Sequence, residues 1–290
     1  MLKVFGAGAV LAAGLITSIV AMPTAWAADI VWAGCGITKK AFMAELAQAF
    51  EAKEGIKISI EGGGASRGLR DTARGKVTMG GSCRMALPHT DNAELFVELH
   101  PVAWDALSVI MHRDNPVRGL SSDQVRGVYT GSITNWKQLG GQDAPIKLYV
   151  RRGKVSGVGY AIRQYLFKDS QQEFASDFVV KSSGPLEEAV EKDPHAMGIT
   201  GISSARKRNV KVIGLDGLEP TFENVRDGKY DLYRPLYLVT GPNVKPEVKQ
   251  FVAFATSKEG RSILRENGTV PYADAPHLMS KLLVYGFGVK

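Results

Sequence analysis

Residues 29–84 read DIVWAGCGITKKAFMAELAQAFEAKEGIKISIEGGGASRGLRDTARGKVTMGGSCR and alternate strand signals with helix signals. Short runs rich in apolar and β-branched residues predict strands at 29–33, 57–60 and 77–79. Residues 39–54 place Phe42, Leu46 and Phe50 on one face and predict an amphipathic helix. Ser66 is predicted to cap a second helix that runs through Arg74.

This order of strands and helices is typical of a parallel sheet, in which ligands bind at the carboxyl ends of the strands. Three turns fall at that edge, and each is rich in glycine, serine or threonine: 34–38, 62–67 and 80–84. Such turns let backbone N–H groups approach an anion closely. The segment therefore predicts an α/β fold with an anion-binding edge.

A second anion signal lies at residues 150–159, which read VRRGKVSGVG. The predicted strand at 146–150 ends in Arg151, Arg152 and Lys154, and Ser156 begins a helix whose first N–H groups lack partners within the helix. A solvated basic loop with an ordinary serine cap explains the same residues equally well. The segment alone leaves both interpretations open.

The N-terminus has the pattern of a secretory signal peptide. Lys3 precedes an uncharged apolar run, and Pro23 and the small-residue site Ala25-Trp26-Ala27 follow it. Residues 1–27 are therefore predicted to be removed on export, which places the protein in the periplasm. The alternatives are an uncleaved membrane anchor and a lipoprotein site at Cys35, and the pattern favours cleavage over both.

The charge of the chain is modest. Loss of Lys3 with the leader leaves a net charge of +6, from 36 basic and 29 acidic residues in the whole chain. Basic runs interleaved with aromatic residues are missing from the sequence, and the basic run at 205–208 is predicted to be a solvated turn. The composition therefore argues against a nucleic-acid partner.

The rest of the sequence continues the alternation without an internal repeat. Strands are predicted at 102–111, 146–150, 197–200, 211–214 and 233–240, and helices at 121–130, from Ser156, at 185–191 and at 246–266. The long strands at 102–111 and 233–240 bracket the middle third of the chain. They are the expected crossings between a first lobe, residues 28–107 plus 236–290, and a second lobe, residues 108–235.

Several segments carry a family resemblance. They are Trp104-Asp105-Ala106-Leu107-Ser108-Val109-Ile110, Asp114-Asn115-Pro116, the stretch from Tyr129 to Gly141 with Thr130-Gly131-Ser132-Ile133-Thr134-Asn135-Trp136, Arg234-Pro235-Leu236-Tyr237-Leu238 and Asn267-Gly268-Thr269-Val270-Pro271. In this order they closely resemble periplasmic phosphate-binding proteins of ABC transporters. The resemblance spans nearly the whole mature chain.

The resemblance implies a two-lobed α/β fold, that of a type II periplasmic binding protein. Each lobe is then a mainly parallel sheet flanked by helices, and two hinge-crossing strands join the lobes. The implied function is capture of phosphate or a related oxyanion between the lobes and its delivery to an ABC permease. A monomer that is not an enzyme and uses neither cofactor nor metal ion is expected.

The resemblance also implies a ligand-binding set. The family motif Arg-x-x-x-Ser-Gly-Thr is similar to Arg152, Ser156 and Gly157, with Val158 in place of the threonine. The three turns of the first lobe contribute the remaining implied binding residues, which are Gly36, Ile37, Thr38, Ser66, Ser82, Cys83 and Arg84.

Two departures from the family pattern affect the expected ligand. Lys154 stands where an acidic residue is usual, and Cys83 stands where a ligand-facing aspartate is usual. Such an aspartate only accepts hydrogen bonds and so favours a protonated oxyanion. With Arg84 and Lys154 added, we expect a more electropositive pocket that suits a fully ionised anion or one with an extra carboxylate. Phosphate stays the default ligand.

Cys35 and Cys83 are the two cysteines of the chain. The turns that hold them adjoin in the predicted sheet, and an oxidising compartment favours a disulfide between them. The alternative is a pair of thiols at the pocket rim that binds a soft species, such as arsenite or a thiophilic metal.

Two further functions stay open on the sequence. One is an oxyanion or arsenite sensor that reports to a signalling partner. The other is a secreted hydrolase, because Gly64-Ala65-Ser66-Arg67-Gly68 matches a nucleophile-elbow pattern. Ser66 would then need His100, His112, His195 or His277, and none of these has local support.

Overall fold

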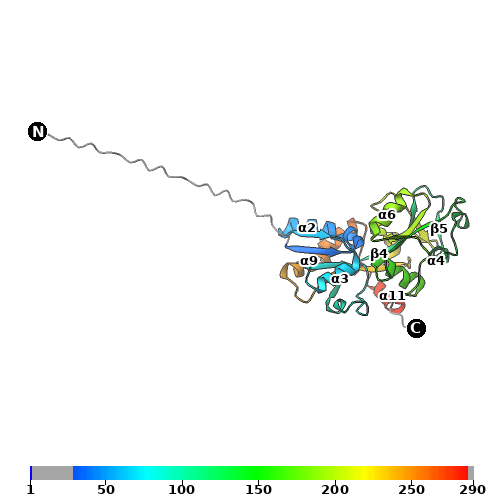
Figure 1. The fold of residues 1–290 in the computed structure, drawn as a ribbon. Helices are drawn as coiled ribbons and strands as arrows, with labels where there is room; N and C mark the ends of the chain where they lie inside the picture. Colours follow the sequence, from blue (N-terminus) through cyan, green and yellow to red (C-terminus); the bar gives the residue numbers. More distant parts are fainter. Residues whose placement is uncertain (2–28, 287–290) are drawn as a thin grey trace.

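The computed structural model describes Met1 and residues 29–286, so the predicted signal peptide lies outside the described residues apart from Met1. Figure 1 shows two lobes side by side with strand β4, Glu98–His112, running between them. We call the lobe that carries the first strands lobe I and the other lobe II. Within the described part of the chain, none of the helices is long and apolar enough to cross a bilayer.

Lobe I is built on a mixed sheet with the strand order β2-β1-β3-β10-β4. The new strands are β1 (Ile30–Gly34), β2 (Ile58–Glu61), β3 (Met79–Ser82) and β10 (Tyr233–Thr240), and β11 (Val270–Pro271) also pairs with β4. β1 pairs in parallel with β2 and β3, while β10 is antiparallel to both β3 and β4. The parallel arrangement predicted from residues 29–84 is confirmed.

Lobe II uses the second half of β4. That half pairs antiparallel with β8 (Ala196–Gly201) and β9 (Val210–Leu215). β8 is parallel to β6 (Lys147–Arg151), β6 is parallel to β7 (Phe178–Val180), and β5 (Gly119–Leu120) is parallel to β9. The antiparallel pairs thus involve the strands at the crossing, and the parallel pairs lie to either side of it.

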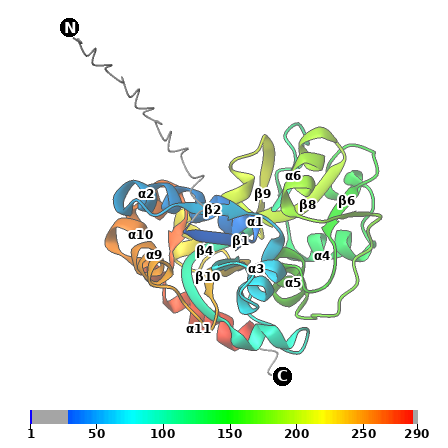
Figure 2. The ribbon, with the colours of Figure 1, turned by 60° about the vertical axis from the view of Figure 1, so that its left-hand side comes forward.

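Helices cover both sheets. Those before β6 are α1 (Gly36–Thr38), η1 (Lys39–Met43), α2 (Ala44–Glu54), α3 (Gly64–Ala73), η2 (Asn92–Phe96), α4 (Ser122–Thr130) and η3 (Trp136–Leu139). Those after it are α5 (Gly157–Ala161), η4 (Ile162–Phe167), α6 (Ser183–Lys192), α7 (Ile202–Ala205), α8 (Phe222–Arg226), α9 (Pro246–Thr256), α10 (Lys258–Glu266), η5 (Tyr272–Asp274) and α11 (His277–Gly286). Figure 2 shows α1, α3 and α5 where the lobes meet, and α3 contacts α5 across that junction.

Two local predictions need correction. The helix predicted at 246–266 is two helices, because Ser257 is extended and its side chain accepts a hydrogen bond from the N–H of Gly260, which starts α10. Ser66 does not cap α3 but is the third residue of that helix, whose N-cap is Gly63. The helix predicted at 121–130 is confirmed as α4, and a capping box between Ser121 and Gln124 starts it.

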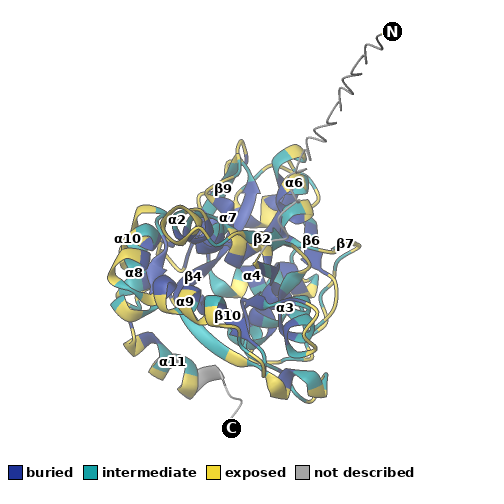
Figure 3. Cartoon of the chain, turned by 90° about the vertical axis from the view of Figure 1, so that its left-hand side faces the viewer, coloured by how far each residue is buried: buried dark blue, intermediate teal, exposed yellow. Residues whose placement is uncertain are grey.

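The core is continuous through the crossing between the lobes. Buried apolar residues lie along the strands, while the outward faces of helices such as α2 and α10 are exposed (Figure 3). Trp104 is 1% exposed, stacks on Tyr272 with ring centroids 5.1 Å apart, and meets Tyr233 edge-on. Trp104 and Trp136 are both buried packing residues.

Glycines allow α3 to lie directly on the ends of β1 and β3. A Cβ atom added at Gly68 would lie 2.4 Å from the carbonyl oxygen of Gly81 and 3.0 Å from that of Ala33. This close approach brings the turn that precedes α3 beside the turns that follow β1 and β3. The three glycine-rich turns predicted from the sequence therefore share one edge of lobe I.

Gly68→Ala should destabilise the protein by about 2 kcal/mol, because the added methyl group meets backbone atoms that cannot rotate away. Urea unfolding followed by circular dichroism measures the change. Gly62→Ala is the matched control, since nothing lies within 4 Å of a Cβ atom built at that position. Equal midpoints for the two variants would contradict the packing described here.

Candidate functional site

The junction of the lobes brings together the turns that the sequence singled out. From lobe I, the guanidinium Nε of Arg84 donates to the carbonyl oxygen of Val155 at 2.9 Å, and the Ser66 hydroxyl donates to the same oxygen at 3.4 Å. Gly157, the first residue of α5, lies against the Cys83 sulfur. The segment at 150–159 of lobe II thus faces the turns of lobe I, as the resemblance implied.

Arg84 does not add free positive charge to this junction, which corrects the expectation from the sequence. Both of its terminal nitrogens donate to the Glu94 carboxylate, at 2.7 and 2.9 Å, and both side chains of this ion pair are fully buried. The remaining N–H groups reach Val155, Ser66 and the carbonyl oxygen of Met85. Arg84 is therefore a neutralised structural cation that connects the two lobes.

The pKa of Glu94 follows from this pairing. Burial opposes the charge of the carboxylate, but hydrogen bonds from Arg84 and from the N–H of Leu87 outweigh it and lower the pKa below its ordinary value of 4.5.

The arginine of lobe II that enters the junction is Arg151, whereas the resemblance implied Arg152. Successive side chains of a strand point to opposite faces, and β6 ends with Arg151 buried and Arg152 exposed. Arg151 donates from Nη1 to the Ser183 hydroxyl at 2.8 Å and from Nη2 to the carbonyl oxygen of Lys181 at 2.9 Å. Burial lowers the pKa of this guanidinium.

A second buried arginine, Arg234, lies at the crossing of the lobes and was missed as a binding residue. It is carried by β10, is 1% exposed, and has one weak carboxylate contact, from Nη2 to Asp105 Oδ2 at 3.5 Å. Burial opposes its charge, but the nearby Cys83, Asp105 and Cys35 outweigh burial and raise its pKa. A lone charged residue inside the apolar strand 233–240 was the sequence signal that could have revealed it.

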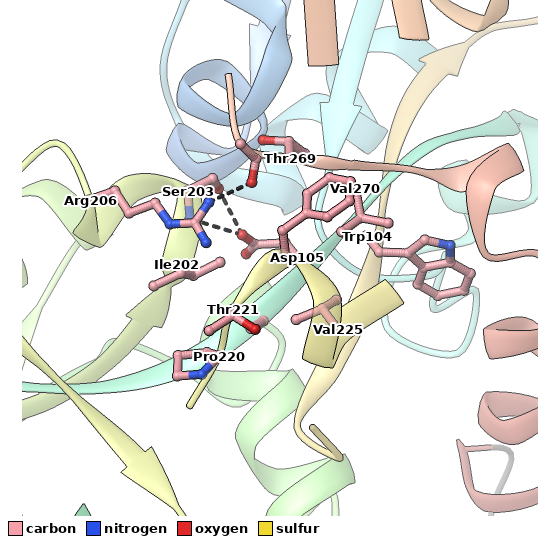
Figure 4. Close-up of a pocket in the computed structure, with 13 residues that line it drawn as sticks. Trp104, Asp105, Ile202, Ser203, Arg206, Pro220, Thr221, Val225, Thr269 and Val270 are labelled. Atoms are coloured by element: carbon pink, nitrogen blue, oxygen red, sulfur yellow. Dashed lines mark hydrogen bonds between the residues drawn. The ribbon is translucent and has the colours of Figure 1, made fainter. Parts of the chain in front are cut away.

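Asp105 is held on its other side by lobe II. Its Oδ1 accepts hydrogen bonds from the backbone N–H of Ser203 at 3.1 Å and from the Ser203 hydroxyl at 2.7 Å. Figure 4 shows Asp105 and Ser203 at the wall of a small pocket that Arg206 and Thr269 also line. Burial raises the pKa of Asp105, against the effect of Arg234.

Four buried donor groups at this junction have no partner among the described residues. They are Nε and Nη1 of Arg234, Nε of Arg151 and the hydroxyl Oγ1 of Thr38. Thr38 is fully buried, and its backbone N–H lies beside the Cys35 sulfur. Buried donors of this kind are normally satisfied, so their gathering at one place indicates a site for a group that accepts hydrogen bonds.

The other implied binding residues have mainly structural contacts. Gly36 is exposed, and Ile37 packs against Gly201 of lobe II. The Ser82 hydroxyl donates to the carbonyl oxygen of Arg84 and accepts from its N–H, which closes the turn after β3. Ser156 is the N-cap residue of α5, as predicted, and its hydroxyl donates to the carbonyl oxygen of Gly153.

Cys35 and Cys83 are both buried free thiols, so the disulfide expected from the sequence is not formed in the structure. The neighbouring Cys83 thiol lowers the pKa of Cys35 against the effect of burial, and the charge of Arg234 lowers it further. Burial and the neighbouring Cys35 raise the pKa of Cys83. Cys35 is therefore the more acidic thiol of the pair.

A second ion pair crosses the junction near α1. Lys40 donates from Nζ to Glu187 Oε2 and to the Ser204 hydroxyl, each at 2.9 Å. The Glu187 carboxylate is fully buried and also accepts from the hydroxyls of Thr200 and Ser204. Glu187 is thus saturated with its own partners.

The surroundings of Ser66 do not support a nucleophile. Its hydroxyl accepts from Arg84 and donates to Val155, and no histidine is among the hydrogen-bond partners that the described residues provide for it. His100, one of the candidate bases, shares a hydrogen bond with Thr240, and burial lowers its pKa. The arrangement resembles an interlobe contact rather than a catalytic pair.

A family model described as "PBP superfamily domain" matches residues 23–259. The chain belongs to the PBP superfamily. Among curated relatives, the phosphate-binding protein PstS of Bacillus subtilis is 27% identical over 219 residues, which are 75% of this chain and 72% of that protein. PstS of Borreliella burgdorferi is 31% identical over 176 residues, which are 57% of this chain and 63% of that protein.

Solved structures that are similar to this chain support the same fold. An X-ray structure from Clostridium perfringens, named for a phosphate ABC transporter substrate-binding protein with bound phosphate, is 28% identical. It has a TM-score of 0.77, with 83% of this chain and 98% of that chain covered. An ABC-type phosphate transport receptor from Vibrio cholerae is 25% identical, with a TM-score of 0.63 and coverage of 83% and 99%. The two-lobed type II fold expected from the sequence is confirmed.

Glu94→Gln should destabilise this PBP-superfamily chain by about 3 kcal/mol at neutral pH, because it leaves the buried charge of Arg84 without its partner. The pH dependence has a defined sign. The folded-state pKa of Glu94 is below 4.5, so its stabilisation is complete above that pH and is lost as the pH falls through the folded-state pKa. Urea midpoints between pH 7 and pH 3 should therefore fall more steeply for the wild type than for Glu94→Gln.

The control is Glu259→Gln, which removes the exposed ion pair with Lys53 and should change the midpoint little. Parallel pH profiles for wild type and Glu94→Gln would show that Glu94 is not the titrating group.

Gly157→Ala should hold the lobes apart. The added Cβ atom would lie 2.3 Å from the Cys83 sulfur and 3.2 Å from the Ala65 Cβ atom, so the junction cannot close around it. Small-angle X-ray scattering should give a larger radius of gyration. Cys83→Ala in the same chain should restore the wild-type value, and Gly184→Ala, whose Cβ atom meets nothing closer than 3.9 Å, is the matched control. An unchanged radius for Gly157→Ala would refute the contact.

Proposed function

We propose that this protein is a solute-binding protein that holds phosphate or a related inorganic oxyanion at the junction of its lobes and delivers it to an ABC permease. It acts as a monomer in the periplasm, after removal of the predicted signal peptide. Binding closes the lobes, because two-lobed binding proteins open and close about a hinge.

The observation that carries this proposal is the set of unpartnered donors on Arg151, Arg234 and Thr38. Burying a guanidinium group without full pairing costs several kcal/mol, and an oxyanion among these donors would remove that cost. Planar guanidinium groups also fit tetrahedral oxyanions well, since they present paired N–H groups. The named phosphate-binding relatives and the phosphate-bound structure from Clostridium perfringens support the same ligand class.

The lobes we propose are residues 28–107 plus 236–290 and residues 108–235. The change of partner along β4 supports the first boundary, since the last residue paired with β10 is Ala106 and the first residue paired with β8 is Leu107. The second boundary lies within β10, next to Arg234. The ligand therefore binds beside the hinge.

The charges around the donors favour a fully ionised anion. Asp105 is turned toward Ser203 and gives Arg234 only a weak contact, and Glu187 is saturated by Lys40 and by hydroxyl groups. A protonated oxyanion would need an acceptor for its O–H group.

Titration calorimetry with phosphate, arsenate and sulfate tests the proposal. Arg234→Met and Arg151→Met should each weaken binding about 100-fold, because each removes a buried, charge-assisted set of hydrogen bonds. Arg152→Met is the matched control, since its side chain is exposed and adjacent in sequence, and it should bind like the wild type. Equal loss in Arg152→Met, or no heat with any of the three anions, would overturn the proposal.

A further inference from the structure

The two cysteines form a preorganised dithiol at the junction of the lobes. Cys35 follows β1 and Cys83 follows β3, and these strands are parallel neighbours in which Gly34 faces Gly81. The backbone N–H of Cys35 donates to the carbonyl oxygen of Gly81 at 3.0 Å, which fixes one turn on the other. The side chains are 3% and 0% exposed, and because the two turns are fixed on each other, both thiols lie in the same buried region of the junction.

The environment of the dithiol consists mainly of hydrogen-bond donors. The charges of Arg234 and Arg151 act on the thiols, and the unpartnered nitrogens of both arginines and the Thr38 hydroxyl lie in the same buried region. A divalent metal ion does not suit this place, because two guanidinium charges repel it. The described residues also contain no group of three or more His, Cys, Asp or Glu side chains that could hold one.

A neutral thiophilic oxyacid suits both parts of the site. Trivalent arsenic in As(OH)3 is uncharged near neutral pH, and arsenic in this state is soft and bonds strongly to thiolate sulfur. The hydroxyl oxygen left on arsenic can accept hydrogen bonds from the buried donors.

We propose that Cys35 and Cys83 form a binding site for a trivalent arsenic oxyacid, with the unpartnered donors of Arg234, Arg151 and Thr38 around its remaining oxygen. Two As–S bonds form and two As–O bonds break. The Cys83 thiol proton leaves with one hydroxide as water, and the hydroxide that Cys35 displaces takes the Cys35 proton or, where Cys35 is already deprotonated, a proton from solvent. Arsenic stays trivalent, so the step needs neither an oxidant nor a reductant. Opening of the lobes gives access to the buried sulfurs, because Gly157 of lobe II covers Cys83.

This site shares the arginines of the proposed oxyanion site but does not depend on phosphate binding. The two ligands use different bonds: phosphate would be held by donors alone, whereas the arsenic oxyacid is held by sulfur. Because both occupy the same junction, each should exclude the other. Phosphate binding and arsenite binding can therefore fail independently.

The test uses the mature chain, reduced with a phosphine, desalted without oxygen and incubated with sodium arsenite. Intact-mass spectrometry under native conditions should show one arsenic atom per chain, with the mass of As(OH)3 less two waters. The chain has two cysteines in all. The number of thiols per chain that a titration detects should therefore fall from two to none when arsenic binds. Calorimetry should show that arsenite lowers the apparent affinity for phosphate.

Two comparisons make the result specific. Cys35→Ser and Cys83→Ser should each weaken arsenite binding about 100-fold or more. In each variant a single As–S bond holds the arsenic, because the second, intramolecular As–S bond cannot form. The same chain in urea should also bind far more weakly, since its two cysteines are no longer held together. A circular dichroism melt of each serine variant shows whether it is folded.

Absence of arsenic on the reduced, folded wild-type chain would overturn the proposal even if phosphate binds. So would loss of only one thiol, or equal binding by the folded and urea-unfolded chains. Wild-type uptake of arsenic stands as a readout even if both serine variants fail to fold.

Discussion

The positive charge of Arg234, buried on a central strand where the lobes cross, is the constraint on which the other features of the junction depend. A guanidinium group in this position must have charge and acceptors near it, and the chain supplies them only in part. Asp105 approaches from β4 but is held by Ser203, and the Cys35 and Cys83 sulfurs approach from the turns of lobe I. The charge of Arg234 is therefore only partly compensated within the chain, and this determines what kind of group the junction can bind.

The other charges at the junction have complete partners, and this contrast singles out the candidate site. Arg84 is paired with Glu94, and Lys40 is paired with Glu187, with hydroxyl or carbonyl groups completing each set. These pairs connect the lobes and fix their relative position. Among the described side chains, the arginines left with unpartnered nitrogens at the junction are Arg151 and Arg234. The binding region is therefore marked by the place where buried cations lack hydrogen-bond partners, and not by the number of cations.

Much of the architecture could be predicted from the sequence because it rests on local patterns. The strand and helix order of residues 29–84, the long strands, the capping box at Ser121 and the cap at Ser156 depend on periodicity and on backbone hydrogen bonding within a few residues. The choice between Arg151 and Arg152 could not be predicted in this way. It depends on which face of β6 is buried, and the structure buries Arg151 whereas the family motif aligns Arg152.

The sequence by itself determined an α/β chain with glycine-rich turns at one sheet edge and a basic turn before a helix, which is enough to indicate an anion. The tertiary structure alone decided which cations are available, because that depends on partners distant in sequence. Arg84 is neutralised by Glu94, whereas Arg234 meets Asp105 only across two paired strands. It also decided that Cys35 and Cys83, whose turns the predicted sheet already placed side by side, are free thiols and not a disulfide.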